Sequence, residues 1–423
     1  MGYLGTLARH IGGVISVFLF IYLLSLVTLN LDFLNPFEQT LKDFRLTDLY
    51  FSKLRDDAAV ARDTNIVLVN IGELPRDGIA EQINILSECQ PKVIGLDALF
   101  DGERDAPVDS ALSAAFERAQ NVVLACSLAR DTVIGKEIYY DSMWRPIEKF
   151  SKYVELAYAN MVTEETGATN DDFATCRVFS PFETLVEGKN KPKRELFLST
   201  AIARRFDAKK VDAFLAQADH REFINFRGNW NKFTVLDVDD VLKKNFTPEL
   251  IKGKIVLMGY MGSDYTALTW DGDRFYTPLN ANLVGRTLPD MYGVVVHANI
   301  ISMLLEGNDI KKLPTWINYG IVVLLVLLNV VIFSFIYYNE KLGLWYDVCT
   351  KVIQFFEVAL LAYASLLILD EFGTIIETGL AMLCIALVGD LLEVYLAVAA
   401  NLANIVRKRR LRQAENNEAE SST

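Results

Sequence analysis

The sequence predicts an α/β protein: one exported domain with a mostly parallel sheet and helices on both faces, plus four transmembrane helices. Three observations support this. The chain of 423 residues is 52% hydrophobic, which is more than soluble globular proteins usually carry. Long uncharged apolar runs lie near both ends of the chain. Between them, short apolar strand patterns alternate with helical patterns, as in parallel sheets covered on both faces.

The first apolar run, residues 11–29 (IGGVISVFLFIYLLSLVTL), follows a short N-terminal segment, residues 1–10. At about 1.5 Å per residue it is long enough to cross a hydrocarbon layer of about 30 Å. A cleaved signal peptide is the alternative. The run is too long for that, however, and NLDFLNPFEQ after it has no small-x-small cleavage site. We therefore expect an uncleaved anchor.

Three further spans are predicted near the other end, at residues 314–338, 352–369 and 375–399. The final segment, residues 400–423, begins with the basic run RKRRLR and ends in a polar tail, whereas the turn before the last span is acidic. Basic residues favour the cytoplasmic side. We therefore expect a multi-pass protein of the bacterial inner membrane with both termini in the cytoplasm and residues 30–313 in the periplasm.

Composition argues against several function classes. The net charge is −12, and an acidic exported domain offers no basic stripe for phosphates, so we expect no nucleic acid partner. The exported cysteines, Cys89, Cys126 and Cys176, are odd in number and irregularly spaced. They imply neither a zinc site nor a disulfide framework, although one bridge is compatible with them. The remaining cysteines, Cys349 and Cys384, lie in the membrane part.

Strand and helix patterns alternate through the exported domain. Strands are predicted at residues 65–71, 92–100, 121–128, 221–228 and 254–260. Helices are predicted at residues 77–89, 108–120, 195–206 and 238–244. Residues 293–305 (GVVVHANIISMLL) are predicted as a strand that leads into a helix, and residues 130–190 as an irregular excursion with weak strands.

This order of segments resembles the second type of CHASE domain, the extracytoplasmic sensor that precedes histidine kinases, nucleotide cyclases and protein kinases in bacteria. The resemblance covers about residues 36–313, and GKIVLMG and GVVVHANII with TPL between them are its most specific pieces. It implies a sensor that binds a small-molecule or envelope signal, and the dimeric habit of such receptors implies a homodimer.

Two departures from the family pattern affect the prediction. The first strand ends in VNIGE, with Asn70 and Gly72 where the family usually has acids and Glu73 just beyond, so Glu73 is the tentative ligand residue there. After the last span, residues 400–423 are too few for a kinase or cyclase domain. We therefore expect the input half of a receptor, acting on a separate cytoplasmic or membrane output protein.

The acids after the predicted strands are candidate ligand residues. Asp97 and Asp101 flank the end of the strand at 92–100, and open α/β sheets bind ligands at this carboxyl edge. Asp264, with Asp271 and Asp273, approaches the same edge from the later strand. Together these carboxylates would hold a cation or an amine ligand. Asp is equally an ordinary residue of loops and N-caps, so a structural role remains the alternative for each.

His297 and Asn299 complete the candidate set, as ligand contacts or as structural residues of a strand-to-helix junction. His297 has no partner residues for catalysis or metal binding. The only other exported histidine is His220, and the sequence has neither a GxSxG motif nor a metal-ligand spacing. The segment GYMG after the strand at 254–260 matches no phosphate-binding motif and predicts a tight turn. We therefore expect no enzyme, no cofactor and no metal.

Three acids lie within the predicted membrane spans: Glu357, Asp390 and Glu393, with Lys351 as the nearest base. Charged side chains in a bilayer usually face the bundle interior or a partner. We hypothesise that a partner helix supplies a base or that one carboxylate carries a proton. Acids hydrogen-bonded within their own bundle are the alternative.

Taken together, these patterns predict a membrane-anchored sensor that relays a signal through its helices. Two other classes stay open. One is an envelope scaffold or accessory subunit of a membrane protein complex. The other is an external hydrolase that uses the Asp cluster with a metal.

Overall fold

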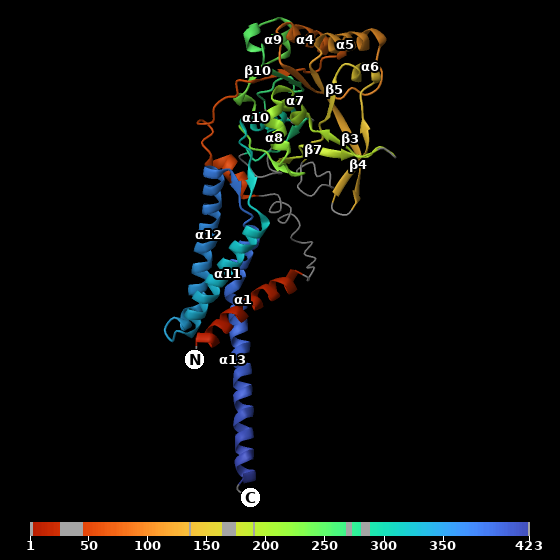
Figure 1. Cartoon of the computed structure of the whole chain (residues 1–423). Helices are drawn as coiled ribbons and strands as arrows, with labels where there is room; N and C mark the ends of the chain where they lie inside the picture. Colours follow the sequence, from red (N-terminus) through yellow and green to blue (C-terminus); the bar gives the residue numbers. More distant parts are fainter. Residues whose placement is uncertain are drawn as a thin grey trace. The chain divides into compact units, whose positions relative to one another are not determined.

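The computed structural model describes residues 3–25, 45–134, 137–162, 175–188, 191–267, 273–280 and 288–421. The chain divides into two compact units. One comprises Asn35–Ile310, and the other joins Met1–Leu34 to Lys311–Thr423. The first unit corresponds to the predicted exported domain and contains the sheet, and the second contains the long apolar helices (Figure 1).

A parallel sheet forms the centre of the first unit. Its strands are β1 (Ile66–Asn70), β2 (Val93–Asp97), β3 (Val122–Ile134), β10 (Thr234–Leu236) and β11 (Ile255–Gly259). They lie in the order β10-β1-β11-β2-β3, and each neighbouring pair is parallel. The mostly parallel sheet is therefore confirmed. The late strand β11 lies between β1 and β2, which precede it by far in the sequence.

Helices cover both faces of this sheet. On one face, α4 (Arg76–Glu88), α5 (Ala106–Ala119) and α9 (Val238–Leu242) share a hydrophobic core with residues of β1, β2 and β11 that alternate along each strand. On the other face lie α7 (Leu198–Phe206) and α10 (Gly293–Glu306), with α8 (Ala208–Leu215) against them. Gly95 of β2 faces Ile202 of α7, and Gly259 of β11 faces Val294 of α10. The alternation of strand side chains thus directs every second residue to α7 and α10.

The excursion predicted at 130–190 is more regular than expected, although two of its strands, β5 (Glu155–Tyr158) and β6 (Val178–Phe179), fall where weak strands were predicted. β3 continues past the end of β2 and forms an antiparallel hairpin with β4 (Glu137–Trp144). The further strands β5 (Glu155–Tyr158), β7 (Phe182–Leu185) and β8 (Lys193–Leu196) extend the sheet to nine strands. These strands are short and mix charged with aromatic residues, so they lack the continuous apolar runs that marked the central strands.

Two other local predictions need correction. In GVVVHANIISMLL the helix α10 begins at Gly293, and only β13 (Met291–Tyr292) is strand. Every residue from Gly293 to Leu305 is buried, so the helix has no polar face to give a 3.6-residue signal and its valines suggested a strand instead. In the predicted strand 221–228, only β9 (Glu222–Phe223) pairs with another strand, β6 (Val178–Phe179).

The remaining short elements are α3 (Leu46–Leu49), the π-helix η2 (Tyr50–Leu54), α6 (Glu148–Ser151), the 3-10 helices η3 (Trp230–Lys232), η4 (Pro248–Leu250) and η5 (Gly343–Trp345), β12 (Arg274–Phe275), β14 (Lys311–Lys312) and β15 (Thr374–Ile375).

Asn70 holds the carboxyl ends of β1 and β11 together. Its buried carboxamide accepts hydrogen bonds from the backbone N–H groups of Gly72 and Met261, both at 2.9 Å. The same side chain donates to Asp237 Oδ1 and to the carbonyl of Gly262, also at 2.9 Å. The segment GYMG is therefore a turn anchored by Asn70. The acids that the family pattern has at this position would lack the donors that these last two bonds need.

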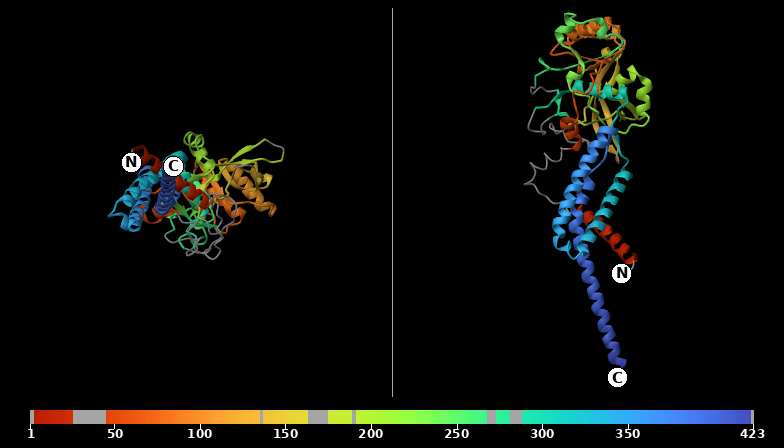
Figure 2. Two further views of the ribbon diagram at one scale, coloured as in Figure 1. Left: turned by 90° about the horizontal axis from the view of Figure 1, so that it is seen from below. Right: turned by 90° about the vertical axis from the view of Figure 1, so that its left-hand side faces the viewer.

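In the second unit, three helices are long and apolar enough to cross a membrane: α11 (Thr315–Tyr338), α12 (Tyr346–Phe372, preceded by η5) and α13 (Gly379–Ser421). They support the three predicted C-terminal spans. The predicted first span, 11–29, falls only partly on α1 (Tyr3–Ser25), because residues 26–44 lie outside the described part. The helix α13 continues well past the other helices into the basic tail (Figure 2).

We expect Asn70→Ala to lower the free energy of unfolding by about 2–4 kcal/mol, because it leaves buried donors and acceptors unpaired. The measurement is the urea midpoint of the full-length protein, followed by tryptophan fluorescence. Asn84→Ala is the matched control, since Asn84 only accepts a bond from the exposed Arg118 side chain. An equal shift in both variants would show that the Asn70 network adds no stability.

Candidate functional site

The strongest candidate site lies at the carboxyl edge of β2. Asp97 ends this strand and is in register with Gly259 of β11, which is in turn in register with Asn70 of β1. Because Ile94 and Leu96 belong to the core on the α4 and α5 side, Asp97 points to the opposite face, towards α7 and α10. Its side chain is 18% exposed.

Two fully buried side chains from those helices form a chain with Asp97. His297 of α10 has its Nδ1 atom 2.6 Å from the hydroxyl oxygen of Ser199 on α7. Its Nε2 atom lies 3.7 Å from Asp97 Oδ2 and has no hydrogen-bond partner among the described residues. The sequence singled out Asp97 and His297, and the structure brings them together. Ser199 went unnoticed because no motif surrounds it.

Asp273 is the second carboxylate of this edge. It precedes β12, and its carbonyl accepts a hydrogen bond from Gly293, the first residue of α10. A Cβ atom on Gly293 would lie 3.2 Å from Asp273 Oδ1, so the glycine lets the helix start close to this carboxylate. We call Asp97, Asp273, His297 and Ser199 together the acidic edge.

Burial sets the protonation of the acidic edge. It raises the pKa of Asp97 to about 8, with the neighbouring charge of Asp273 adding to the effect. Burial also raises the pKa of Asp273 to about 6 and lowers that of His297 to about 3. At pH 7 the edge therefore holds an ionised Asp273, a protonated Asp97 and a neutral imidazole.

Ser199, His297 and Asp97 are the three residue types of a hydrolytic triad, but the serine is not exposed as a nucleophile would be. Ser199 and His297 are both 0% exposed, and Ser199 lies inside the first turn of α7 rather than on a strand-to-helix elbow. No group of His, Cys, Asp and Glu side chains that would hold a metal ion occurs in the described ranges. The arrangement is suited to hydrogen bonding and proton exchange with a bound group.

The other predicted site residues lie apart from the acidic edge. Glu73 and Asp101 are exposed, and the loop of Asp101 is held by Arg76 through main-chain carbonyls. Asp264 is exposed and accepts bonds from Thr266, which lower its pKa. Asn299 is buried and binds the backbone of Gly228 in both directions, at 3.1 and 2.9 Å. Asp271 lies outside the described residues.

The cysteines form no disulfide, since all five are free thiols. Burial raises the pKa of Cys126 and of Cys176 to about 12 in each case. Both are small buried core residues, whereas Cys89 is half-buried.

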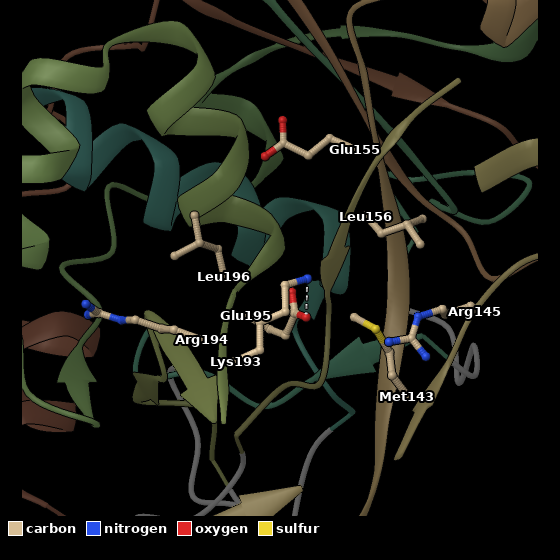
Figure 3. Close-up of a pocket in the computed structure, with 8 residues that line it drawn as sticks. All are labelled: Met143, Arg145, Glu155, Leu156, Lys193, Arg194, Glu195 and Leu196. Carbon is tan, nitrogen blue, oxygen red and sulfur yellow. Dashed lines mark ion pairs between the residues drawn. The ribbon is translucent and has the colours of Figure 1, made fainter. Parts of the chain in front are cut away.

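A hollow of about 340 Å³ lies apart from the acidic edge, beside β8 (Figure 3). It is lined by Met143, Arg145, Glu155, Leu156, Lys193, Arg194, Glu195 and Leu196. All four residues of β8 line this cleft. Because successive strand residues point to opposite faces of a sheet, a cleft that contacts all of them must run along the edge of the strand. Among the described strands, β8 pairs only with β7 and β5 only with β3, apart from a bridge between Tyr158 and Phe197.

In the helical unit, the predicted membrane acids have separate partners. Asp390 of α13 forms an ion pair with Lys351 of α12 at 2.7 Å, and both side chains are about half exposed. Glu357 accepts a hydrogen bond from Asn329 of α11 at 2.8 Å. Glu393 is exposed on α13.

Comparison with known protein families shows the family to which this chain belongs. The family model of the CHASE2 domain matches residues 16–333. The chain belongs to the CHASE2 family. CHASE2 is an extracytoplasmic sensor-type domain, and the match confirms the resemblance noted from the sequence. No curated protein and no solved structure matches the chain.

Asp97→Asn should change how stability depends on pH. The folded-state pKa of Asp97 is about 8, above an unfolded value of about 3.9. Its ionisation therefore destabilises the fold as pH rises, by up to about 1.4 kcal/mol per pH unit. Asp273, whose folded-state pKa is about 6, acts in the same sense, and His297, whose folded-state pKa is about 3, acts in the opposite sense. Both effects fade above about pH 6.5 to 7 and are common to the wild type and Asp97→Asn, so the difference between the two profiles from about pH 6.5 to 8 reports Asp97.

We expect the wild type to lose about 1–2 kcal/mol of unfolding free energy across this range, and Asp97→Asn to lose less. Thermal midpoints measured at closely spaced pH values check this. Asp101→Asn, at an exposed position of the following loop, is the control. Parallel pH profiles for the wild type and Asp97→Asn would contradict the assignment.

Proposed function

We propose that this CHASE2 protein is a membrane-anchored sensor that binds a signal at the acidic edge and relays it through its apolar helices to a separate output protein. The observation that carries the proposal is the polar chain that the half-buried Asp97 forms with the buried His297 and Ser199 at the carboxyl edge of the sheet. Ligands of open α/β sheets bind at this edge, and the family is of sensor type.

The connectivity of the chain supports a relay. His297 lies on α10, and only eight residues, Gly307 to Pro314, separate α10 from the first long apolar helix, α11. A ligand that binds better to one arrangement of α10 against β2 shifts the protein towards that arrangement. We propose that the periplasm is where the first unit meets its signal and that the inner membrane holds the helices, with both termini in the cytoplasm.

We further propose that the protein is not an enzyme. The burial of Ser199 and His297 supports this, because a substrate would have to displace α7 or α10 to reach the hydroxyl. The metal-dependent hydrolase considered above would need a ligand set that the described residues do not assemble.

A scaffold or accessory subunit is the second candidate function. The cleft along β8 favours it, because β5 and β8 each present an edge to which an extended segment of a partner protein would add. The two candidates differ in their main ligand. The sensor binds a small molecule in the exported unit, whereas the scaffold binds protein alone.

Affinity purification of the full-length chain from its native membrane, followed by mass spectrometry, tests the relay. We expect a second membrane or cytoplasmic protein to co-purify in a fixed ratio. A chain that is recovered alone, as a homodimer or larger homo-oligomer, would contradict a separate output protein and leave the dimer as the signalling unit.

The intramembrane acids give a sharper version of this test. We expect the combined substitution Glu357→Gln, Asp390→Asn and Glu393→Gln to reduce the recovered partner about tenfold or more, since removing charges from a desolvated contact costs more than about 1.4 kcal/mol. Glu340→Gln, in the exposed connection after α11, is the control. If the triple variant keeps its partner at the wild-type level, these acids do not contact it.

A further inference from the structure

We propose that the acidic edge binds the protonated amino group of a small organic molecule, held by the carboxylates of Asp97 and Asp273 and by His297 Nε2. This inference deepens the proposed sensor function and rests on it, since it names the chemical class of the signal. It follows from two independent observations, the unpaired carboxylates and the unpartnered imidazole nitrogen.

The first observation is that the two carboxylates lack a base. Three other acids of this unit pair with arginine, each at 2.7 Å: Asp109 with Arg76, Asp48 with Arg177, and Glu183 with Arg221. The buried Asp63 instead accepts hydrogen bonds from Ser302 and from the Asn65 backbone. In the described part of the chain, neither Asp97 nor Asp273 forms an ion pair with Lys or Arg, and His297 is the only base beside them. Two neighbouring, half-buried carboxylates with no cation beside them disfavour each other's ionised form, so Asp97 keeps its proton at pH 7. A cationic ligand would supply the missing charge.

The second observation is the unused nitrogen of His297. Nε2 is buried, has no hydrogen-bond partner in the described residues, and points at Asp97 Oδ2 from 3.7 Å. That separation is too long for a direct hydrogen bond. Both atoms are therefore free to accept a hydrogen bond from an N–H donor of a ligand.

The bond between Ser199 and His297 makes this possible. When Nδ1–H donates to the Ser199 hydroxyl oxygen, Nε2 carries no hydrogen and is an acceptor. The distance of 2.6 Å is compatible with that tautomer. The burial of both residues keeps water from competing for Nε2. Ser199 is therefore a positioning residue, which sets the tautomer of His297 and does not itself contact the ligand.

An ammonium group fits these acceptors better than a metal ion. A divalent cation would require more ligands than the edge offers, since the described residues contain no metal-binding group of three or more side chains. An N–H donor, by contrast, requires only two or three acceptors of the kind present. The N-terminus of α10 beside Asp273 also helps that carboxylate to stay ionised.

Binding at neutral pH must release a proton. With the pKa of Asp97 at about 8, its carboxyl group is mostly protonated at pH 7, whereas Asp273 is ionised. The groups that face Asp97 are Asp273 and His297, and the imidazole stays neutral throughout. The ammonium ion keeps its own proton and stabilises the Asp97 carboxylate, so the Asp97 proton leaves to solvent. Affinity therefore rises with pH up to about 8 and then levels off.

Titration calorimetry of the full-length protein in detergent tests the proposal with defined probes. Methylammonium and 1,4-diaminobutane carry N–H donors. Tetramethylammonium has the same charge without donors, and Mg²⁺ and Ca²⁺ represent metals. We expect saturable binding of at least one N–H probe, with release of most of one proton at pH 7 and almost none at pH 9, measured in buffers of different ionisation enthalpy. Absence of binding by both N–H probes, or equal binding of tetramethylammonium, would overturn the proposal, as would saturable binding of a divalent ion alone.

Two variants localise the binding. Asp97→Asn, of equal size, should weaken the N–H probe at least tenfold and abolish proton release, and Asp273→Asn should weaken it as well. Asp101→Asn should change neither quantity. Unchanged binding in both test variants would place the probe elsewhere and refute the site.

The outcome is separable from that of the sensor proposal. A partner protein that co-purifies while no ammonium probe binds removes the ligand class and keeps the relay. Ammonium binding without any partner keeps the ligand site and removes the separate output.

Discussion

The position of β11 between β1 and β2 is the constraint on which the rest of the sheet-containing unit depends. It places Asn70, Gly259 and Asp97 in one row across three strands. A Cβ atom at Gly259 would lie 2.7 Å from Val294 Cβ, so only glycine lets α10 approach the strand this closely. That approach brings His297 to Asp97. The acidic edge therefore forms only when β11 has paired with β1 and β2 and α10 has packed on the sheet.

The electrostatics of the unit follow from this packing. Elsewhere in the unit, buried polar groups have partners: Asp109 pairs with Arg76, and the Asn70 carboxamide bonds to backbone groups and to Asp237. At the acidic edge the same fold leaves two carboxylates and an imidazole without such partners. The loss of folding stability is limited because Asp97 is protonated at neutral pH, which removes one of the two negative charges. Polar groups without partners lower the stability of the fold, and they leave hydrogen bonds that a ligand would make.

The central fold was predictable because its strands carry uninterrupted apolar runs and its helices have one apolar face. The sequence pattern also pointed to Asp97 and His297, because the end of a strand and the junction between a strand and a helix can be predicted from one sequence. It failed for the start of α10, which is buried all round, and for β4 and β8, whose mixed sequences carry no apolar run and become strands through pairing with β3 and β7. Ser199 was invisible for a similar reason: it meets His297 across 98 residues of sequence, and a lone serine in a helix carries no signal.

The same constraint bears on how a signal would leave the site. A ligand changes the protein only by the difference between its affinities for two arrangements, with about 1.4 kcal/mol for each tenfold difference. A group held jointly by Asp97 on β2 and His297 on α10 binds most strongly when strand and helix lie at one particular distance. Binding is thus sensitive to the position of α10. The chain runs from α10 to α11 through only eight residues. Two of these residues form β14, which pairs with β15, the strand that follows α12. A displacement of α10 therefore has a short covalent route to the apolar helices.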